Sequence, residues 1–147
     1  MQKKLVLFLI CVIGVFSYNV KKAVAYANKY CDKRNKNYHD YSNEGGDCAN
    51  FVSQCLIAGG MKLSDECVVD SHGSVINVGK LEDCLVKKGW HHKVSSSIPE
   101  GFKKGGVITI NNSGHAMFAV TKTTYAAHTN DRCGYQIPNT KNKYFWK

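Results

Sequence analysis

The first apolar pattern of the chain has the period of a helix. Apolar residues recur at i, i+3, i+4 and i+7 from Val20 to Ala27, which places them on one side of a helix. The pattern predicts an amphipathic helix over residues 19–31. The polar stretch that follows, "DKRNKNYHDYSNEGG", has no period and is typical of a loop that leads into the next helix.

The next apolar stripe predicts a second helix over residues 48–58. The stripe consists of Phe51, Val52, Cys55 and Leu56. Two glycines follow it, and we expect the helix to end there with Gly59 as its left-handed cap. A weaker pattern, "VGKLEDCLVKKGW", predicts a third, short helix that Gly89 closes.

Beyond residue 90 the period changes from helical to strand-like. The runs "GGVITI", "HAMFAV" and "TTYAAH" are short, rich in β-branched and aromatic residues, and separated by turn residues. The runs "CGYQI" and "KYFW" are weaker examples of the same pattern. Helices followed by strands predict an α+β domain in which N-terminal helices pack on an antiparallel sheet.

The N-terminal residues have the layout of a secretory signal peptide. The basic segment "MQKK" precedes "LVLFLICVIGVF", an apolar run that is short for a membrane span, and the small residue Ser17 follows. We expect cleavage before Tyr18, with residues 1–17 as signal peptide and 18–147 as a single secreted domain. The alternatives are a retained anchor or a buried first helix. After removal of the signal we expect no stable membrane insertion.

The chain is basic, but its charge is spread out. Loss of Lys3 and Lys4 from a net charge of +9 leaves about +7, which favours anionic partners. The lysines come in scattered pairs, and no basic stripe is interleaved with aromatics as in a nucleic-acid reader. We therefore predict a solubilising surface and no nucleic-acid partner. We also expect a monomer.

The number and spacing of the cysteines indicate which of them form disulfides and which stay free. One cysteine lies in the predicted signal peptide, and the six others allow fifteen pairings. Cys48 and Cys55 are two helical turns apart, about 10 Å, and cannot bridge each other. Cys55 lies on the apolar stripe, as expected of a buried free cysteine. The pairings that we favour are Cys67 with Cys84 and Cys31 with Cys133.

This pairing leaves Cys48 unpaired in a position that suits a nucleophile. It begins the second predicted helix, where the free N–H groups and the partial positive charge of the helix stabilise a thiolate. The same N–H groups can donate to the oxyanion of a tetrahedral intermediate. Gly45 and Gly46 leave the backbone open to an acyl substrate.

A histidine to serve this cysteine is predicted from the hairpin "GHAMFAVTKTTYAAH". A tight turn centred on Thr121 and Lys122 gives cross-strand partners whose numbers sum to 243, so that His115 faces His128. Directly opposed side chains have Cβ atoms about 4.5–5.5 Å apart, within reach of a hydrogen bond between the rings. We interpret His115 as the base and His128 as the residue that orients it. Asn130 is the alternative orienting residue.

Two other interpretations of these residues are open. A zinc site built from Cys48, His115, His128 or Cys133 is conceivable, but the chain has no C-x₂-C or H-x₃-H spacing, and we predict no metal. A histidine on a strand is more often a satisfied structural group than a catalytic one.

Four segments resemble a known family. "AVAYANKY", "GGDCANFVSQCLIAGG", "SGHAMFAV" and "YAAHTND" are similar to the amidase-domain family of papain-like cysteine hydrolases, which are relatives of the NlpC-type and CHAP-type cell-wall peptidases. The resemblance spans roughly residues 20–135. It implies a papain-like or NlpC-like fold and hydrolysis of an amide bond, often in peptidoglycan peptides, without a cofactor.

The resemblance also assigns roles to residues. It implies that Cys48 is the nucleophile, that His115 is the base, and that a polar residue on the next strand, His128, orients the base. Further candidates for substrate binding, the oxyanion site or orientation are Asp47, Asn130 and Tyr41. The chain departs from the related peptidases at Gly106, where those often have an acidic residue.

The residues therefore predict a secreted cysteine amidase or peptidase whose substrate is a peptide or a peptidoglycan-like polymer. One alternative is a non-catalytic, disulfide-stabilised binding protein of papain-like fold. Another is a cysteine acyltransferase, which would use the same nucleophile and pass the acyl group to an amine.

Overall fold

The structure is a computed structural model that describes residues 17–110, 114–139 and 141–147. Nearly all of the predicted signal peptide lies outside the described residues, so its cleavage stays a prediction. Three helices occupy the N-terminal half, close to the predicted ranges: α1 (Val20–Tyr30), α2 (Cys48–Ala58) and α3 (Val78–Lys87). Two of them begin at an asparagine cap, because Asn19 and Asn77 each accept a backbone N–H of the first turn with the side-chain oxygen.

Six strands form one antiparallel sheet in the order β1-β6-β2-β3-β4-β5. Their bounds are β1 (His92–Ser95), β2 (Val107–Ile110), β3 (His115–Ala119), β4 (Thr124–Ala127), β5 (Arg132–Gln136) and β6 (Lys143–Trp146). The five predicted strands are all present, and β1 is an additional strand that pairs with β6. The α+β arrangement is confirmed.

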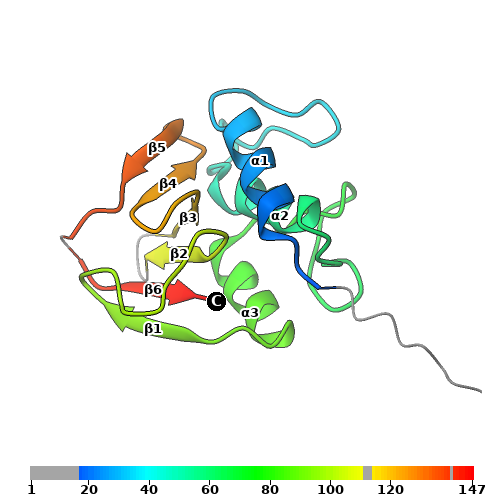
Figure 1. The fold of residues 1–147 in the computed structure, drawn as a ribbon. Helices are drawn as coiled ribbons and strands as arrows, with labels where there is room; N and C mark the ends of the chain where they lie inside the picture. Colours follow the sequence, from blue (N-terminus) through cyan, green and yellow to red (C-terminus); the bar gives the residue numbers. More distant parts are fainter. Residues whose placement is uncertain (1–16, 111–113, 140) are drawn as a thin grey trace, which may run out of the picture.

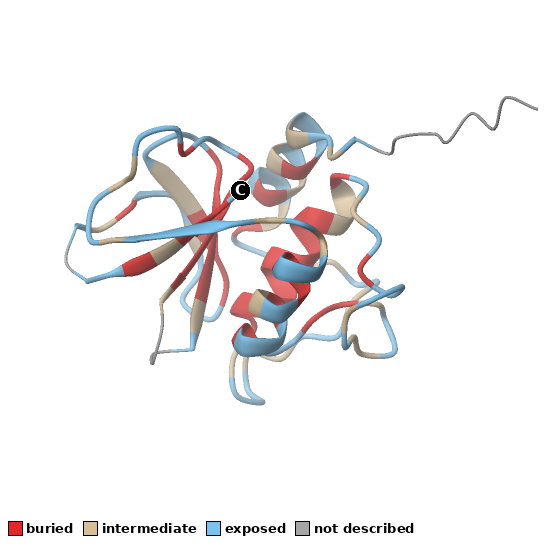
Figure 2. Cartoon of the chain, turned by 90° about the horizontal axis from the view of Figure 1, so that it is seen from below, coloured by how far each residue is buried: buried red, intermediate tan, exposed pale blue. Residues whose placement is uncertain are grey.

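The helices cover one face of the sheet, and α2 is the central helix, which packs on β3 and β4 and contacts both α1 and α3 (Figure 1). Nine of the eleven residues of α2 are buried, and Figure 2 shows the buried residues gathered in the central helix and in the strands beside it. On the helix side of the sheet, Ala116 and Phe118 of β3 belong to the main core together with Cys48. The opposite face carries a smaller core that includes Met117 and Ala119.

Two disulfides fix the chain, and both match the predicted pairing. One joins Cys31, at the end of α1, to Cys133 in β5, and the other joins Cys67 to Cys84 of α3. Cys48 and Cys55 are the free cysteines of the described residues, and both are buried. In the described part of the chain, no helix is long and apolar enough to cross a membrane.

The end of α2 differs from the prediction by one residue. Gly59 has a φ of −76° and is right-handed, whereas Gly60 has a φ of +93° and takes the left-handed conformation. Gly59 has a packing role instead, since a Cβ there would lie 2.4 Å from the Tyr18 ring. A glycine is required at this position by the close approach of Tyr18, and the backbone reversal falls on Gly60.

Candidate active site

Cys48 is the first residue of α2 and lies at the wall of a pocket. The pocket has a volume of about 310 Å³. It is lined by Gly45, Gly46, Cys48, Ile76, Asn77, Val78, Gly79 and Gly114. Four of these eight residues are glycines, so much of the wall around the thiol is backbone. Such a wall leaves room for the main chain of a ligand to approach the sulfur.

The start of β3 lies against the thiol. Sγ of Cys48 donates to the Gly114 carbonyl at 3.6 Å. Burial raises the pKa of Cys48 above its ordinary value of 9.0, while the backbone N–H groups of Ala116, Ala49 and Cys48 itself lower it in part. Burial therefore outweighs the favourable amides of the helix start, and the resting sulfur is a protonated thiol.

The side chain of His115 belongs to the other face of the sheet. His115 pairs with Ile110, and cross-strand partners share a face. Ile110 packs on the smaller core, which lies away from the helices. In this position burial lowers the pKa of His115 below its ordinary value of 6.5, and the positive charge of Arg132 adds to the shift. His115 is thus a neutral imidazole at neutral pH whose backbone, not its ring, borders the thiol.

The predicted pairing of His115 with His128 is wrong, and the turn explains why. Phe118 lies opposite Ala126, so the partner numbers sum to 244 and not 243. The Val120 N–H donates to the Thr124 carbonyl at 3.0 Å, and the turn therefore contains three residues where a tight turn has two. A slip of one residue moves a side chain to the opposite face of a strand.

His128 lies on the helix side of the sheet and is buried in contacts of its own. Its ring stacks on Phe51 of α2, with centroids 4.0 Å apart. Nδ1 is 2.6 Å from a carboxylate oxygen of Asp47, and Nε2 is 2.6 Å from the Tyr30 carbonyl. Both ring nitrogens thus face oxygen acceptors, one on the side chain of Asp47 and one on the backbone of Tyr30. His128 therefore ties the start of α2 to the end of α1 and does not orient His115.

Asp47 is the centre of a buried polar network next to the nucleophile. One carboxylate oxygen accepts the Tyr41 N–H at 3.0 Å and the Asn50 side-chain amide at 2.7 Å. The other oxygen faces His128 and lies 3.3 Å from Nε of Arg34. The side chain of Asp47 is fully buried and its observed contacts are structural, and its predicted role in substrate binding, the oxyanion site or orientation stays a prediction. Asp47 holds the turn that presents Cys48.

Arg34 and Thr129 also belong to this network, although no pattern in the sequence predicts it. Arg34 lies in a loop whose sequence has no regular spacing of apolar residues. Its partner Asp131 is 97 positions away in the chain. Thr129 follows His128 with a φ of +83°, and its hydroxyl accepts the Asp47 N–H at 2.8 Å. A left-handed non-glycine residue beside a buried network marks a position that surrounding contacts enforce. The adjacency of Thr129 to His128 was the only sequence signal for either residue.

The other two predicted site residues also lie elsewhere. Tyr41 donates its hydroxyl to Asp70 at 2.8 Å and does not line the pocket of Cys48. Asn130 is exposed in the turn that follows β4, beyond the end of the strand. The zinc alternative loses one ligand, because Cys133 is bonded to Cys31.

The fold and the site thus define an α+β domain with a free cysteine at the start of its central helix, facing a backbone-lined pocket. Residues 17–145 match the model of the family described as "Putative amidase domain". The match covers most of the chain, and the protein belongs to this amidase family. No solved structure matches the chain.

Two proteins of Bacillus subtilis (strain 168) are similar to parts of the chain. The uncharacterized protein YhbB is 49% identical over 48 residues, which is 33% of this chain and 14% of YhbB. The uncharacterized protein YjcM is 40% identical over 76 residues, which is 52% of this chain and 18% of YjcM. The matched region spans less than a fifth of either relative.

Proposed function

We propose that the protein is a cysteine-dependent amide hydrolase of papain-like type with Cys48 as its nucleophile. The observation that carries the proposal is the placement of Cys48. Cys48 is a free thiol, whereas four other described cysteines form disulfides. It is the first residue of a buried helix, and it lines a pocket. Membership of an amidase family supports an amide as the bond that is cleaved.

The reaction follows from the thiol and the helix start. The sulfur of Cys48 attacks the amide carbonyl carbon, the carbon–nitrogen bond breaks, and the amine leaves with the proton that the thiol gave up. Water then hydrolyses the thioester and restores the thiol. The free N–H groups at the start of α2 donate to the oxyanion of the tetrahedral intermediate.

Such a thiol needs a base, because burial raises the pKa of Cys48. His115 is our candidate, since it directly follows Gly114, whose carbonyl accepts the thiol, and its lowered pKa keeps it neutral and able to take a proton. In this arrangement the ring must turn around the end of β3 to reach the sulfur when substrate binds. Gly114, with a φ of +61°, gives the backbone freedom at that point. His128 acts as a positioning residue for the start of α2.

The pocket favours an extended peptide as substrate. Glycines line much of the wall near the sulfur, so a substrate main chain can approach closely while its side chains point outward. We propose a secreted enzyme that acts on peptide bonds of a peptidoglycan-like polymer. Its net charge, +9 for the full chain and about +7 without Lys3 and Lys4, favours approach to an anionic wall. If activity on purified wall were indifferent to salt, this electrostatic part of the proposal would fail.

One observation favours a second candidate function. The described geometry has the His115 ring on the opposite face from Cys48, as expected of a disulfide-stabilised binding protein that does not catalyse. An acyltransferase would use the same thiol, and product analysis with an added amine separates it from a hydrolase.

The proposal is tested with purified peptidoglycan and mass analysis of the released fragments. We expect the wild type to release fragments, Cys48→Ala to release none, and the matched control Cys55→Ala to remain active, because the Cys55 thiol is fully buried in the core. His115→Ala should reduce the rate by roughly 100-fold or more if it is the base. Equal release by wild type and Cys48→Ala would refute the assignment of the nucleophile, and an inactive wild type would favour the binding protein.

A further inference from the structure

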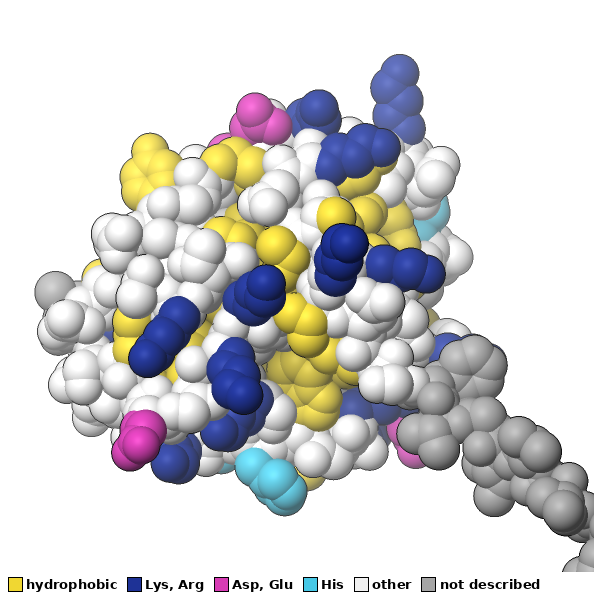
Figure 3. Space-filling model, viewed as in Figure 1, with side chains coloured by type: hydrophobic (Ala, Val, Ile, Leu, Met, Phe, Trp, Pro, Cys, Tyr) yellow, Lys and Arg dark blue, Asp and Glu magenta, His cyan; other side chains and the backbone are white. Residues whose placement is uncertain are grey.

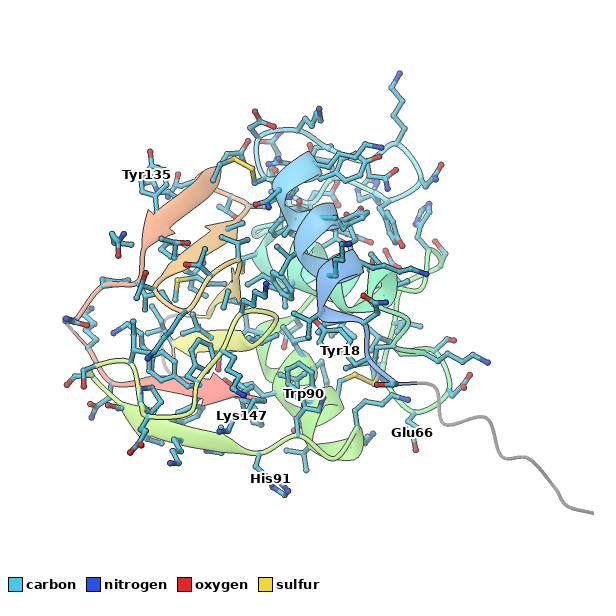
Figure 4. All side chains as sticks on the ribbon, viewed as in Figure 1. Tyr18, Glu66, Trp90, His91, Tyr135 and Lys147 are labelled. Carbon is cyan, nitrogen blue, oxygen red and sulfur yellow. A yellow bond between two sulfur atoms is a disulfide. The ribbon has the colours of Figure 1, made fainter. Side chains whose placement is uncertain are left out.

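A second pocket lies on another part of the surface and shares no lining residue with the pocket of Cys48. Its volume is about 360 Å³. Its walls come from Tyr18, Val20, Trp90, Gly101, Lys103, Lys104, Gly105, Gly106 and Lys147. Figure 4 shows Tyr18, Trp90 and Lys147 close together on one face of the molecule. We call this site the aromatic–lysine pocket.

The aromatic walls are held in place by the fold. The Tyr18 hydroxyl donates to the Gly105 carbonyl at 3.0 Å, and the Tyr18 ring packs directly over Gly59 of α2. The rings of Tyr18 and Trp90 meet edge to face, with centroids 5.5 Å apart and an angle of 67° between their planes. The two rings therefore form a fixed corner before any ligand arrives.

Positive charge surrounds this corner. Lys103 and Lys104 are exposed, and neither forms an ion pair within the described residues. The Lys147 ammonium donates to the Gly101 carbonyl at 3.0 Å at the edge of the pocket. Figure 3 shows the same face, where lysine side chains lie beside exposed apolar surface. Three ammonium groups beside two aromatic rings suit a ligand that carries both negative charge and an apolar face.

We propose that the aromatic–lysine pocket binds an anionic sugar polymer, one whose sugar rings carry carboxylate or phosphate groups. One sugar ring packs by its apolar face against Trp90 in the corner with Tyr18, and its anionic groups pair with Lys103 and Lys104. The Trp90 indole N–H has no hydrogen-bond partner among the described residues, so it is free to donate to a sugar hydroxyl.

The shape of the pocket favours this ligand over other polyanions. Single-stranded nucleic acid is bound on aromatic platforms along which successive bases stack, whereas two rings at 67° accept one ring at a time. A membrane surface is recognised by apolar side chains that project into the lipid. Here the Tyr18 and Trp90 rings are half-buried walls of a hollow, and the lysines are the exposed groups.

The binding does not depend on the cysteine chemistry, and this makes the two proposals separable. The pocket of Cys48 and the aromatic–lysine pocket have no residue in common, so Cys48→Ala should bind the polymer as the wild type does. Bound in this way, the domain would be held on an anionic polymer while its other pocket stays open to substrate.

The test is a titration of the purified full chain with polygalacturonate, followed by tryptophan fluorescence and calorimetry, with neutral dextran and polyglutamate as comparison polymers. We expect polygalacturonate to bind and to change the fluorescence, and dextran not to bind. The double variant Lys103→Gln/Lys104→Gln should bind roughly 10-fold more weakly or worse. The control Lys36→Gln/Lys122→Gln removes the same charge from exposed sites outside this pocket and should lose far less affinity.

A second pair of variants tests the aromatic corner. Trp90→Ala should weaken polygalacturonate binding by roughly 10-fold, whereas Tyr135→Ala removes a half-exposed aromatic on β5, away from the pocket, and should have no effect. Trp90 also packs on the core, so the Trp90→Ala result counts only if the circular dichroism of the variant matches that of the wild type. If it does not match, the lysine variants alone test the proposal. Three results would overturn the proposal. They are equal binding of polyglutamate and polygalacturonate, an equal loss of affinity in both double lysine variants, and binding to anionic vesicles in place of the sugar polymer.

Discussion

Replacement of Asp47 by asparagine should destabilise the protein far more than a typical substitution. The change keeps an oxygen for the Tyr41 N–H and the Asn50 amide, but it removes the charge that faces His128 and Arg34. Both the Asp47 and the His128 side chains are almost completely buried. Removal of one partner from a buried ion pair costs about 3–5 kcal/mol, because the other charge remains buried without compensation.

The size of this effect can be read from urea unfolding. With a dependence of roughly 2 kcal/mol per molar urea, a loss of about 4 kcal/mol lowers the unfolding midpoint by about 2 M. Asp131→Asn is the matched control, because Asp131 pairs with the same Arg34 at 3.0 Å but is 37% exposed. Surface pairs contribute about 0–1 kcal/mol, so the control should lose little.

A double-mutant cycle isolates the contact between Asp47 and His128. We expect His128→Gln to be destabilising alone and the double variant to be more stable than the sum of the two losses predicts, because the second change removes the uncompensated partner. If Asp47→Asn costs no more than Asp131→Asn, the buried network does not hold the start of α2, and the positioning role of His128 fails with it.

Three further predictions concern the thiol, the base and the packing. Burial raises the pKa of Cys48, so the rate of its alkylation by iodoacetamide in the resting protein should be low at pH 7 and still rising at pH 9. A rate that reaches its plateau below pH 8 would show a preformed thiolate and contradict this prediction. His115 must be neutral to accept a proton, and burial lowers its pKa below 6.5. We therefore expect kcat/KM to fall on the acid side only below pH 6.5, and a fall that begins above pH 6.5 would contradict a base in this environment. Gly59→Ala places a Cβ 2.4 Å from the Tyr18 ring, and we expect a loss of about 1–3 kcal/mol by overpacking in thermal unfolding; unchanged stability would show that Tyr18 is not fixed there.

The repeating patterns of the chain were enough to predict most of the fold. The helices and five of the six strands follow from periods of 3.6 and 2, which depend on neighbouring residues alone. The strand β1 was missed because its residues, His92–Ser95, are mostly exposed and carry no apolar alternation. Its partner β6 is about fifty positions away in the chain, so the pairing has no local signal.

The candidate site could be predicted only in part. The free state of Cys48 follows from helical geometry and cysteine pairing, and both disulfides are as expected. The relation of His115 to His128 depends on the number of residues in one turn, and a single residue reverses the face of every side chain beyond it. The contacts of Asp47 join segments from residue 34 to residue 131, which no local pattern in the sequence connects.

The central claim, that Cys48 is the nucleophile of an amide hydrolase, is tested most directly by trapping the acyl-enzyme. The protein is mixed with purified peptidoglycan fragments, quenched in acid within the first turnover, digested and analysed by mass spectrometry. We predict a substrate-derived acyl group on the peptide that contains Cys48, lost on treatment with hydroxylamine, and none on the peptide in Cys48→Ala. Release of product by the wild type without any adduct on Cys48, and equal release by Cys48→Ala, would contradict the account.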